Sequence, residues 1–280
     1  MQSPGQTPSK RTRSTRMLRG FITLTIFVTW TELAFLHFRG SFHDHFMYAP
    51  FLAFPLAVLL GVIGLLKNDE QRSRRSFRIP VLIYALEGLA GTFFHLRGLG
   101  KEMGGTDNWK YNVQTGPPFT APPQVALVGL AGMAAASDVS PTKLARVVDV
   151  TNALGYLFIA TEAAWNHWRG YFYNKLMFIP ALVGPLMALL HLGSLFNVGK
   201  SRKVRGPLSA LSVLAGVIGF GMHVYHIKKW RGGFRDPWGE PRWDRLFFGP
   251  PLFVPLQFLV YGVLSLLTAR SESRGGARYD

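Results

Sequence analysis

Glutamate, histidine and arginine recur together at two places in the chain. Residues 31–50 read TELAFLHFRGSFHDHFMYAP and residues 161–180 read TEAAWNHWRGYFYNKLMFIP, which are identical at nine of twenty positions. A lipid environment favours shared apolar residues, but it does not account for a shared set of ionisable residues. The two stretches therefore indicate an internal duplication that kept a polar set. The retained pairs include Glu32/Glu162, His37/His167, Arg39/Arg169, Gly40/Gly170, Met47/Met177 and Pro50/Pro180.

The match between the two parts of the chain continues into the segments that follow. All differences in length fall between apolar segments, so the sequence predicts two tandem four-helix repeats. Because each repeat has an even number of spans, both should lie the same way up, related by a pseudo-two-fold axis along the membrane normal. The further matching pairs include Pro55/Pro185, Gly88/Gly216, Gly91/Gly219, His95/His223, Pro118/Pro251, Pro122/Pro255 and Gln124/Gln257.

Each repeat carries a histidine near the outward end of its first and of its third apolar segment. A b-type haem needs one axial histidine from each of two helices at equal depth. His37 and His95 meet this condition in the first repeat. His167 and His223 meet it in the second. These four residues are therefore the candidate cofactor ligands.

A non-haem iron or copper centre is a second interpretation, because imidazole and carboxylate are common ligands of such metals. Glu32 and Glu162 would then join the four histidines as ligands, or act as catalytic proton acceptors. Arg39 and Arg169 would orient the carboxylates or hold an anionic group. Glu32 and His37 are five residues apart, which does not match the E-x-x-H spacing of di-iron helices.

Two other interpretations of the same residues stay open. In a structural one, Glu32 and Arg39 lie seven residues apart on one helical stripe and pair with each other, while the histidines cap helix ends. In the other, the ionisable residues mark a substrate or proton path through the membrane.

Four polar residues fall outside the duplicated set. Glu87 has no acidic counterpart in the second repeat and is expected to serve proton movement in one half only. Asp149 and Asn152 are predicted to form a solvated helix start. His191 is the one histidine expected to lie deeper than the outer surface.

Apolar stretches of transmembrane length recur along the 280 residues, of which 48% are hydrophobic and 16% charged. The first stretch follows basic residues but lacks a small-residue cleavage site, so we expect a retained span and not a signal peptide. The predicted fold class is an all-α polytopic membrane protein with eight transmembrane helices. The predicted spans are 20–38, 47–66, 79–96, 117–136, 144–165, 177–196, 207–226 and 250–269.

The formal net charge of +16 is distributed as in a membrane protein. With the N-terminus in the cytoplasm, the inner segments hold 19 Lys and Arg, and the outer ones 12, of which 9 lie in the loops 97–116 and 227–249. This asymmetry follows the positive-inside rule. Basic tails facing anionic lipid explain the charge without a nucleic-acid partner.

Several kinds of chemistry lack their residues in this chain. The absence of cysteine excludes disulfides, thiolate ligands and covalently attached c-type haem. The sequence has no glycine-rich phosphate-binding loop, so nucleotide-driven transport lacks support. It has neither a zinc-protease helix nor Ser, His and Asp in the order of a catalytic triad, so hydrolysis lacks support as well.

The sequence thus predicts an integral membrane redox protein, performing electron transfer or a metal- or haem-dependent oxidation, in the inner membrane with both termini cytoplasmic. The expected partners are the lipid bilayer, a quinone or a periplasmic redox protein, and no nucleic acid. The alternatives are a transporter whose repeats rock about a shared polar site, and an assembly or scaffold subunit. The predicted organisation is a disordered basic tail over 1–16, repeats over 17–140 and 141–270, and a tail over 271–280.

This topology makes a direct prediction for reporter fusions. Fusions within 68–76 and 198–204 should report the cytoplasm, and fusions within 104–112 and 234–242 should report the outside, because inner loops carry the excess of Lys and Arg. A cytoplasmic signal from either long outer loop would contradict the common outer depth of the four histidines.

Overall fold

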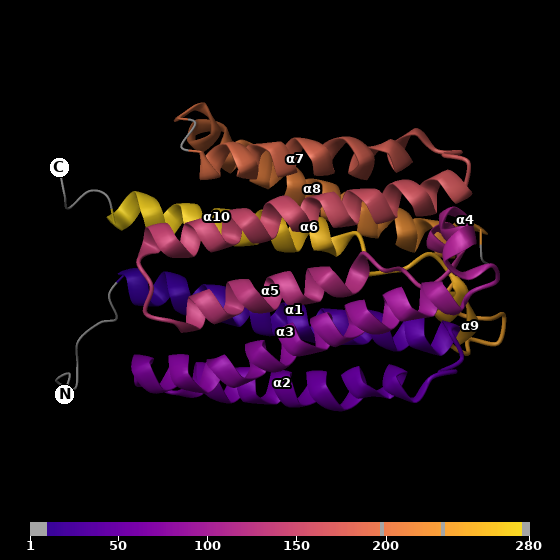
Figure 1. The fold of residues 1–280 in the computed structure, drawn as a ribbon, viewed down its shortest axis with the longest axis horizontal. Helices are drawn as coiled ribbons and strands as arrows, with labels where there is room; N and C mark the ends of the chain where they lie inside the picture. Colours follow the sequence, from indigo (N-terminus) through magenta and orange to yellow (C-terminus); the bar gives the residue numbers. More distant parts are fainter. Residues whose placement is uncertain (1–9, 197–198, 231–232, 276–280) are drawn as a thin grey trace.

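A computed structural model describes residues 10–196, 199–230 and 233–275. Long helices lie side by side in a single bundle, with both described ends of the chain at the same end of it (Figure 1). The described residues form no β-strand, only an isolated bridge between Arg235 and Pro241. The prediction of an all-helical fold is confirmed.

Eight long helices and five short elements make up the described part of the chain. The first half of the bundle holds α1 (Lys10–Arg39), α2 (Ala49–Leu66), α3 (Glu70–Lys101) and α5 (Ala121–Ala136). The second half holds α6 (Pro141–Arg169), α7 (Ile179–Leu195), α8 (Gly199–Trp230) and α10 (Leu256–Gly275). The short elements are η1 (His45–Tyr48), η2 (Gly105–Asn108), α4 (Trp109–Thr115), η3 (Lys175–Phe178) and α9 (Trp243–Phe248).

Six helices in the described residues are long and apolar enough to cross a membrane: Arg13–Arg39, His45–Leu66, Glu70–Lys101, Pro141–Arg169, Lys175–Leu195 and Val204–Lys229. Two further apolar helices, Ala121–Ala136 and Leu256–Ala269, are shorter. The chain therefore has the helices of a multi-pass membrane protein.

Large apolar side chains cover the outside of the bundle. Leu52 and Leu66 of α2 expose 79% and 74% of their surface, and Leu89 of α3 exposes 60%. Extended apolar surface of this kind is unfavourable in water and favourable against lipid chains. The outer surface is consistent with contact to a bilayer.

Helix boundaries differ from the predicted ones at both ends of the chain. The helix α1 begins at Lys10, inside the segment 1–16 predicted to be a disordered tail, and α10 continues to Gly275, inside 271–280. Lys and Arg are good helix formers, so the basic residues extend α1. Arg16 Nη2 also donates to the carbonyl oxygen of Lys67 at 2.5 Å, which ties this extension to the end of α2. The remaining residues of the two predicted tails, 1–9 and 276–280, lie outside the described residues.

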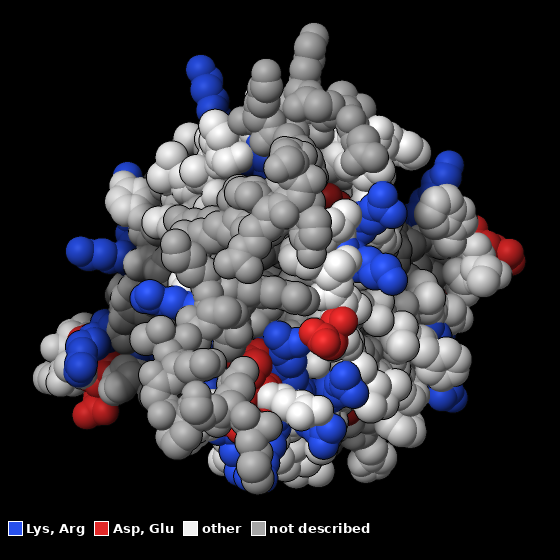
Figure 2. Space-filling view, turned by 90° about the vertical axis from the view of Figure 1, so that its left-hand side faces the viewer, with Lys and Arg blue, Asp and Glu red and all other residues white. Residues whose placement is uncertain are grey.

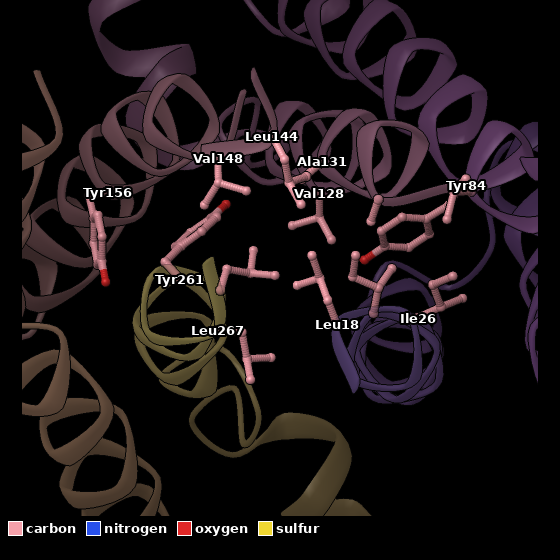
Figure 3. Packing of buried hydrophobic residues seen from close by; sticks show 14 of the residues in the cluster. Leu18, Ile26, Tyr84, Val128, Ala131, Leu144, Val148, Tyr156, Tyr261 and Leu267 are labelled. Carbon is pink, nitrogen blue, oxygen red and sulfur yellow. The ribbon is translucent and has the colours of Figure 1, made fainter. Parts of the chain in front are cut away.

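The interior between the two halves is filled by aliphatic and tyrosine side chains (Figure 3). Tyr261 of α10 lies over Gly155 of α6, where a Cβ would come within 2.3 Å of the tyrosine ring. The halves also contain matching hydroxyl contacts between their first and third helices. These are Thr29 Oγ1 to Tyr84 Oη at 2.8 Å and Tyr156 Oη to Ser212 Oγ at 2.7 Å.

An ion pair links the first and third helices of each half near the end of the bundle that holds the described termini, which we call the inner end. The pair is partly buried in the first half and buried in the second. Lys and Arg side chains are spread over this end (Figure 2). Arg19 of α1 donates to both carboxylate oxygens of Glu70 at 3.0 and 2.9 Å. In the second half the polarity is reversed, and Arg205 of α8 donates to both oxygens of Asp149 at 2.8 and 2.6 Å.

The ion pair corrects one prediction from the sequence. Asp149 and Asn152 were expected at a solvated helix start, but their exposed fractions are 4% and 0%. The helix α6 begins at Pro141, with Ser140 as its cap, so both residues lie two or more turns inside it. There they face other helices and not water.

Close contact between α3 and α5 generates a stability prediction. A Cβ on Gly88 would lie 2.3 Å from the backbone nitrogen of Ala126, whereas Gly100 on the same helix has no atom within 4 Å of that position. We expect Gly88→Ala to cost about 1–3 kcal/mol of stability through overpacking. Gly100→Ala is the matched control and should leave the thermal midpoint unchanged. Equal midpoints for both variants would contradict this packing.

Candidate functional site

The turn between the first and second long helices is built identically in the two halves. Ser41 and Phe42 have left-handed φ values of 58° and 46°, and Tyr171 and Phe172 have 56° and 45°. The side chain two residues further on then caps the next turn. Asp44 Oδ1 accepts from the Phe46 N–H, and Asn174 Oδ1 accepts from the Leu176 N–H, each at 3.0 Å.

This turn brings a backbone carbonyl to the histidine at the end of the preceding helix. His37 Nδ1 lies 2.8 Å from the carbonyl oxygen of Met47, and His167 Nδ1 lies 2.7 Å from that of Met177. A carbonyl oxygen only accepts, so Nδ1 carries the proton in both rings. The Nε2 atom of each ring therefore keeps its lone pair.

The histidines of the third helices are held in the same manner. His95 Nδ1 donates to the carbonyl oxygen of Pro118 at 2.9 Å, and His223 Nδ1 donates to that of Pro251 at 2.6 Å. Pro118 and Pro251 lie in the non-helical segments that lead into α5 and α10. All four imidazoles thus have the same nitrogen bound to backbone. Among the described residues, none of the four Nε2 atoms has a hydrogen-bond partner.

His95 and His43 both lie within electrostatic range of His37, and His167 and His226 both lie within electrostatic range of His223. Two other outer histidines have hydrogen-bond partners of their own. His43 Nδ1 donates to the carbonyl oxygen of Gly40 at 3.0 Å, and His226 Nδ1 lies 2.9 Å from the Tyr173 hydroxyl.

The duplicated glutamates lie elsewhere and connect the two halves. Glu32 Oε2 on α1 accepts from the Phe253 N–H at 2.9 Å, just before α10. Glu162 Oε2 on α6 accepts from Thr120 Oγ1 at 2.5 Å, just before α5. Each carboxylate therefore binds the start of the last helix of the opposite half.

The structure does not bring the glutamates and histidines into one cluster. In the part of the chain described, no three His, Asp or Glu side chains converge as a metal ion would require. The methionines contribute packing: the Met47 methyl group lies 3.1 Å from a Cβ placed on Gly40, and the Met177 methyl group 3.3 Å from one on Gly170. The chain does provide, in each half, two imidazoles whose Nδ1 atoms are bound to backbone carbonyls.

The duplicated arginines differ in their contacts. Arg39 Nε donates to the carbonyl oxygen of Phe247 at 2.8 Å, and its Nη2 donates to that of Gly249 at 2.6 Å. Arg169 is exposed, and its guanidinium donates to the side-chain oxygen of Asn166. Arg39 therefore fastens the loop around α9 to the first half, and Arg169 has no corresponding contact with α4 in the described structure.

A buried polar cluster in the second half was not predicted from the sequence. His191 Nδ1 donates to Asp149 Oδ1 at 2.7 Å, and Asn152 Nδ2 faces His191 Nε2 at 3.4 Å. The signal in the sequence was the spacing of Asp149, Asn152 and Tyr156, which places three polar side chains on one face of α6.

Comparison with protein families, with curated proteins and with solved structures found no match. Function is therefore inferred from the residues and geometry of this chain alone.

The difference between the two arginines gives a paired prediction. Arg39→Ala removes two charge-assisted hydrogen bonds of about 1.5–3 kcal/mol each, so the loop 233–249 should open more often. Limited proteolysis should cut this loop at least about tenfold faster in the variant, since 1.4 kcal/mol is a factor of ten. Arg169→Ala should leave the rate unchanged. Equal rates in both variants would show that Arg39 does not hold the loop.

Proposed function

We propose that the chain crosses the inner membrane eight times, as two tandem four-helix repeats related by a pseudo-two-fold axis along the membrane normal. Matching turns, matching histidine contacts and the reciprocal glutamate contacts support this arrangement. The shorter helices α5 and α10 complete the eight spans. Each is preceded by a non-helical segment that covers part of the distance across the membrane. The excess of Lys and Arg at the inner end supports cytoplasmic termini.

We further propose that the protein is a membrane redox protein in which each half holds one b-type haem between two histidines. His37 and His95 are the ligands in the first half. His167 and His223 are the ligands in the second. The observation that carries this proposal is the fixed orientation of all four imidazoles, with Nδ1–H donated to backbone and Nε2 left with a free lone pair.

These residues fit the ligand chemistry of haem iron. Ligating histidines usually donate their other N–H to a carbonyl or carboxylate, which fixes the tautomer and raises the basicity of the ligating nitrogen. Two neutral imidazoles from two helices are the donor set of a b-type haem. A haem held in this way supplies one-electron transfer.

The remaining polar groups of the duplicated set have supporting roles in this proposal. Glu32 has one buried carboxylate oxygen, Oε1, without a hydrogen-bond partner in the described structure, so it is the better placed of the two glutamates to accept a proton. Arg39 lies close enough for its charge to act on that carboxylate, as Arg169 does for Glu162. A membrane quinone and a redox protein on the outer side are the expected partners, because the histidine pairs lie at the outer ends of α1, α3, α6 and α8.

An absorption spectrum of the purified protein tests this proposal. We expect a Soret band that shifts on reduction, and His37→Ala and His95→Ala should each lower the haem content to about half while leaving a folded protein, because each removes one ligand of one haem. The matched control is His43→Ala, since His43 is an exposed histidine of the same turn whose Nδ1 donates to Gly40.

Two outcomes would overturn the proposal. A protein with neither a Soret band nor bound iron or copper would favour the transporter or the scaffold subunit. Unchanged cofactor content in both histidine variants would show that these side chains only cap helix ends.

A further inference from the structure

A buried polar cluster occupies the second half near the inner end of the bundle. His191 of α7 donates from Nδ1 to Asp149 Oδ1 at 2.7 Å, and Arg205 of α8 donates to both oxygens of that carboxylate. His191 and Asn152 are fully buried, and Asp149 and Arg205 are each 4% exposed. Asp149 precedes His167 by eighteen residues of α6, roughly 27 Å at 1.5 Å per residue. The cluster is thus separate from the histidine pairs.

Asp149 determines which nitrogen of His191 carries a proton. The carboxylate accepts, so Nδ1–H donates, and Nε2 keeps its lone pair. Nε2 faces Asn152 Nδ2 at 3.4 Å, which is a long hydrogen bond, and the same amide nitrogen donates to the Tyr261 carbonyl oxygen at 3.0 Å. His191 therefore presents a basic nitrogen that is only weakly bound.

A second observation concerns the amide beside this nitrogen. Asn152 Oδ1 is buried and has no hydrogen-bond partner in the described structure. If the amide turns over, Oδ1 faces Nε2 and accepts a hydrogen bond from it once Nε2 is protonated. Oδ1 would then also face the Tyr261 carbonyl oxygen, so the turned amide has to rotate away from this carbonyl, which still accepts from the backbone N–H one helical turn further on. One amide can therefore serve the ring in either protonation state.

The first half shows that this fold does not need the cluster. At the spacing of the duplicated stretches, Arg19, Ile22 and Gly61 occupy the positions of Asp149, Asn152 and His191. Ile22 is fully buried, Gly61 packs against Thr23, and Arg19 pairs with Glu70, so this place in the first half holds neither an imidazole nor an amide. Buried polar networks are often no more stabilising than well-packed apolar residues, which favours a function for this one. This comparison rests on the proposed duplication, and the contacts of His191 do not.

We propose that His191 binds and releases a proton at Nε2 in exchange with the inner side of the membrane, with Asp149 and Asn152 as positioning residues. One N–H bond forms or breaks in this step. The ionisable groups around the ring are Asp149 and Arg205, together with Tyr156, whose ring stacks on His191 at 5.9 Å. The hydroxyl of Tyr156 is directed to Ser212, so it does not compete for Nε2.

Nitrogen NMR of the full-length protein, labelled with ¹⁵N-histidine, tests the proposal. The signals absent from His191→Gln identify this residue, and Gln keeps an amide donor for Asp149. In the unsubstituted protein we expect Nδ1 protonated and Nε2 bare at alkaline pH, and both nitrogens protonated on acidification between about pH 8 and about pH 5. A His191 ring that stays neutral over this whole range would overturn the proposal.

Asn152→Ile supplies a second test that keeps the ring and Asp149. Isoleucine is the residue of the first half at this position, so the variant should fold. The imidazolium would lose its acceptor, and we expect the His191 midpoint to fall by about one pH unit, the equivalent of ~1.4 kcal/mol. This shift also identifies the signal if His191→Gln is not recovered in folded form. An unchanged midpoint for every histidine would contradict the role of Asn152.

Discussion

Two carboxylates, Glu32 and Glu162, connect the halves of the bundle by reciprocal contacts on which the outer end of the molecule depends. Each carboxylate extends from the first helix of its own half and binds the start of the last helix of the other half. Glu32 accepts from the Phe253 N–H, and Glu162 accepts from the Thr120 hydroxyl. Groups removed from water inside a membrane must find partners within the protein, because lipid supplies none. The two starts are the non-helical segments that also present the carbonyls of Pro251 and Pro118 to the third-helix histidines. The contact between the halves and the orientation of these histidines therefore belong to one local structure.

The halves resemble each other at the outer end and differ at the inner end. At the outer end, turn conformation, histidine contacts and glutamate contacts recur in both. At the inner end, the ion pair between the first and third helices has reversed polarity, with Arg19 in place of Asp149. The reversal places a carboxylate on α6, where it can hold His191, and the first half has no such group at that position. Duplication thus leaves two cofactor sites of one kind in our proposal, and a proton site in one half only.

Much of the fold could be predicted from the sequence, but part of the site could not. The length of the apolar stretches indicated the helices, and the prolines and glycines that recur in both halves indicated their order. The pairing of His37 with His95 was inferred from equal depth, and it remains a prediction. The contacts of Glu32 and Glu162 were not predictable, because nothing in a single segment shows that a carboxylate reaches the opposite half. Asp149 and Asn152 were misassigned since polar residues near a predicted helix start usually face water, and only the packing of α7 and α8 reveals that they are buried.

The central claim is that each half carries its own cofactor site, and the ratio of haem to protein tests it most directly. The account predicts two haems per chain in the unsubstituted protein, one in His37→Ala, and none in the variant that combines His37→Ala with His167→Ala. The ratio falls in steps because the two pairs belong to different helices and share no ligand. A chain that binds no haem, or a single haem lost completely on replacing His37 alone, would contradict the account.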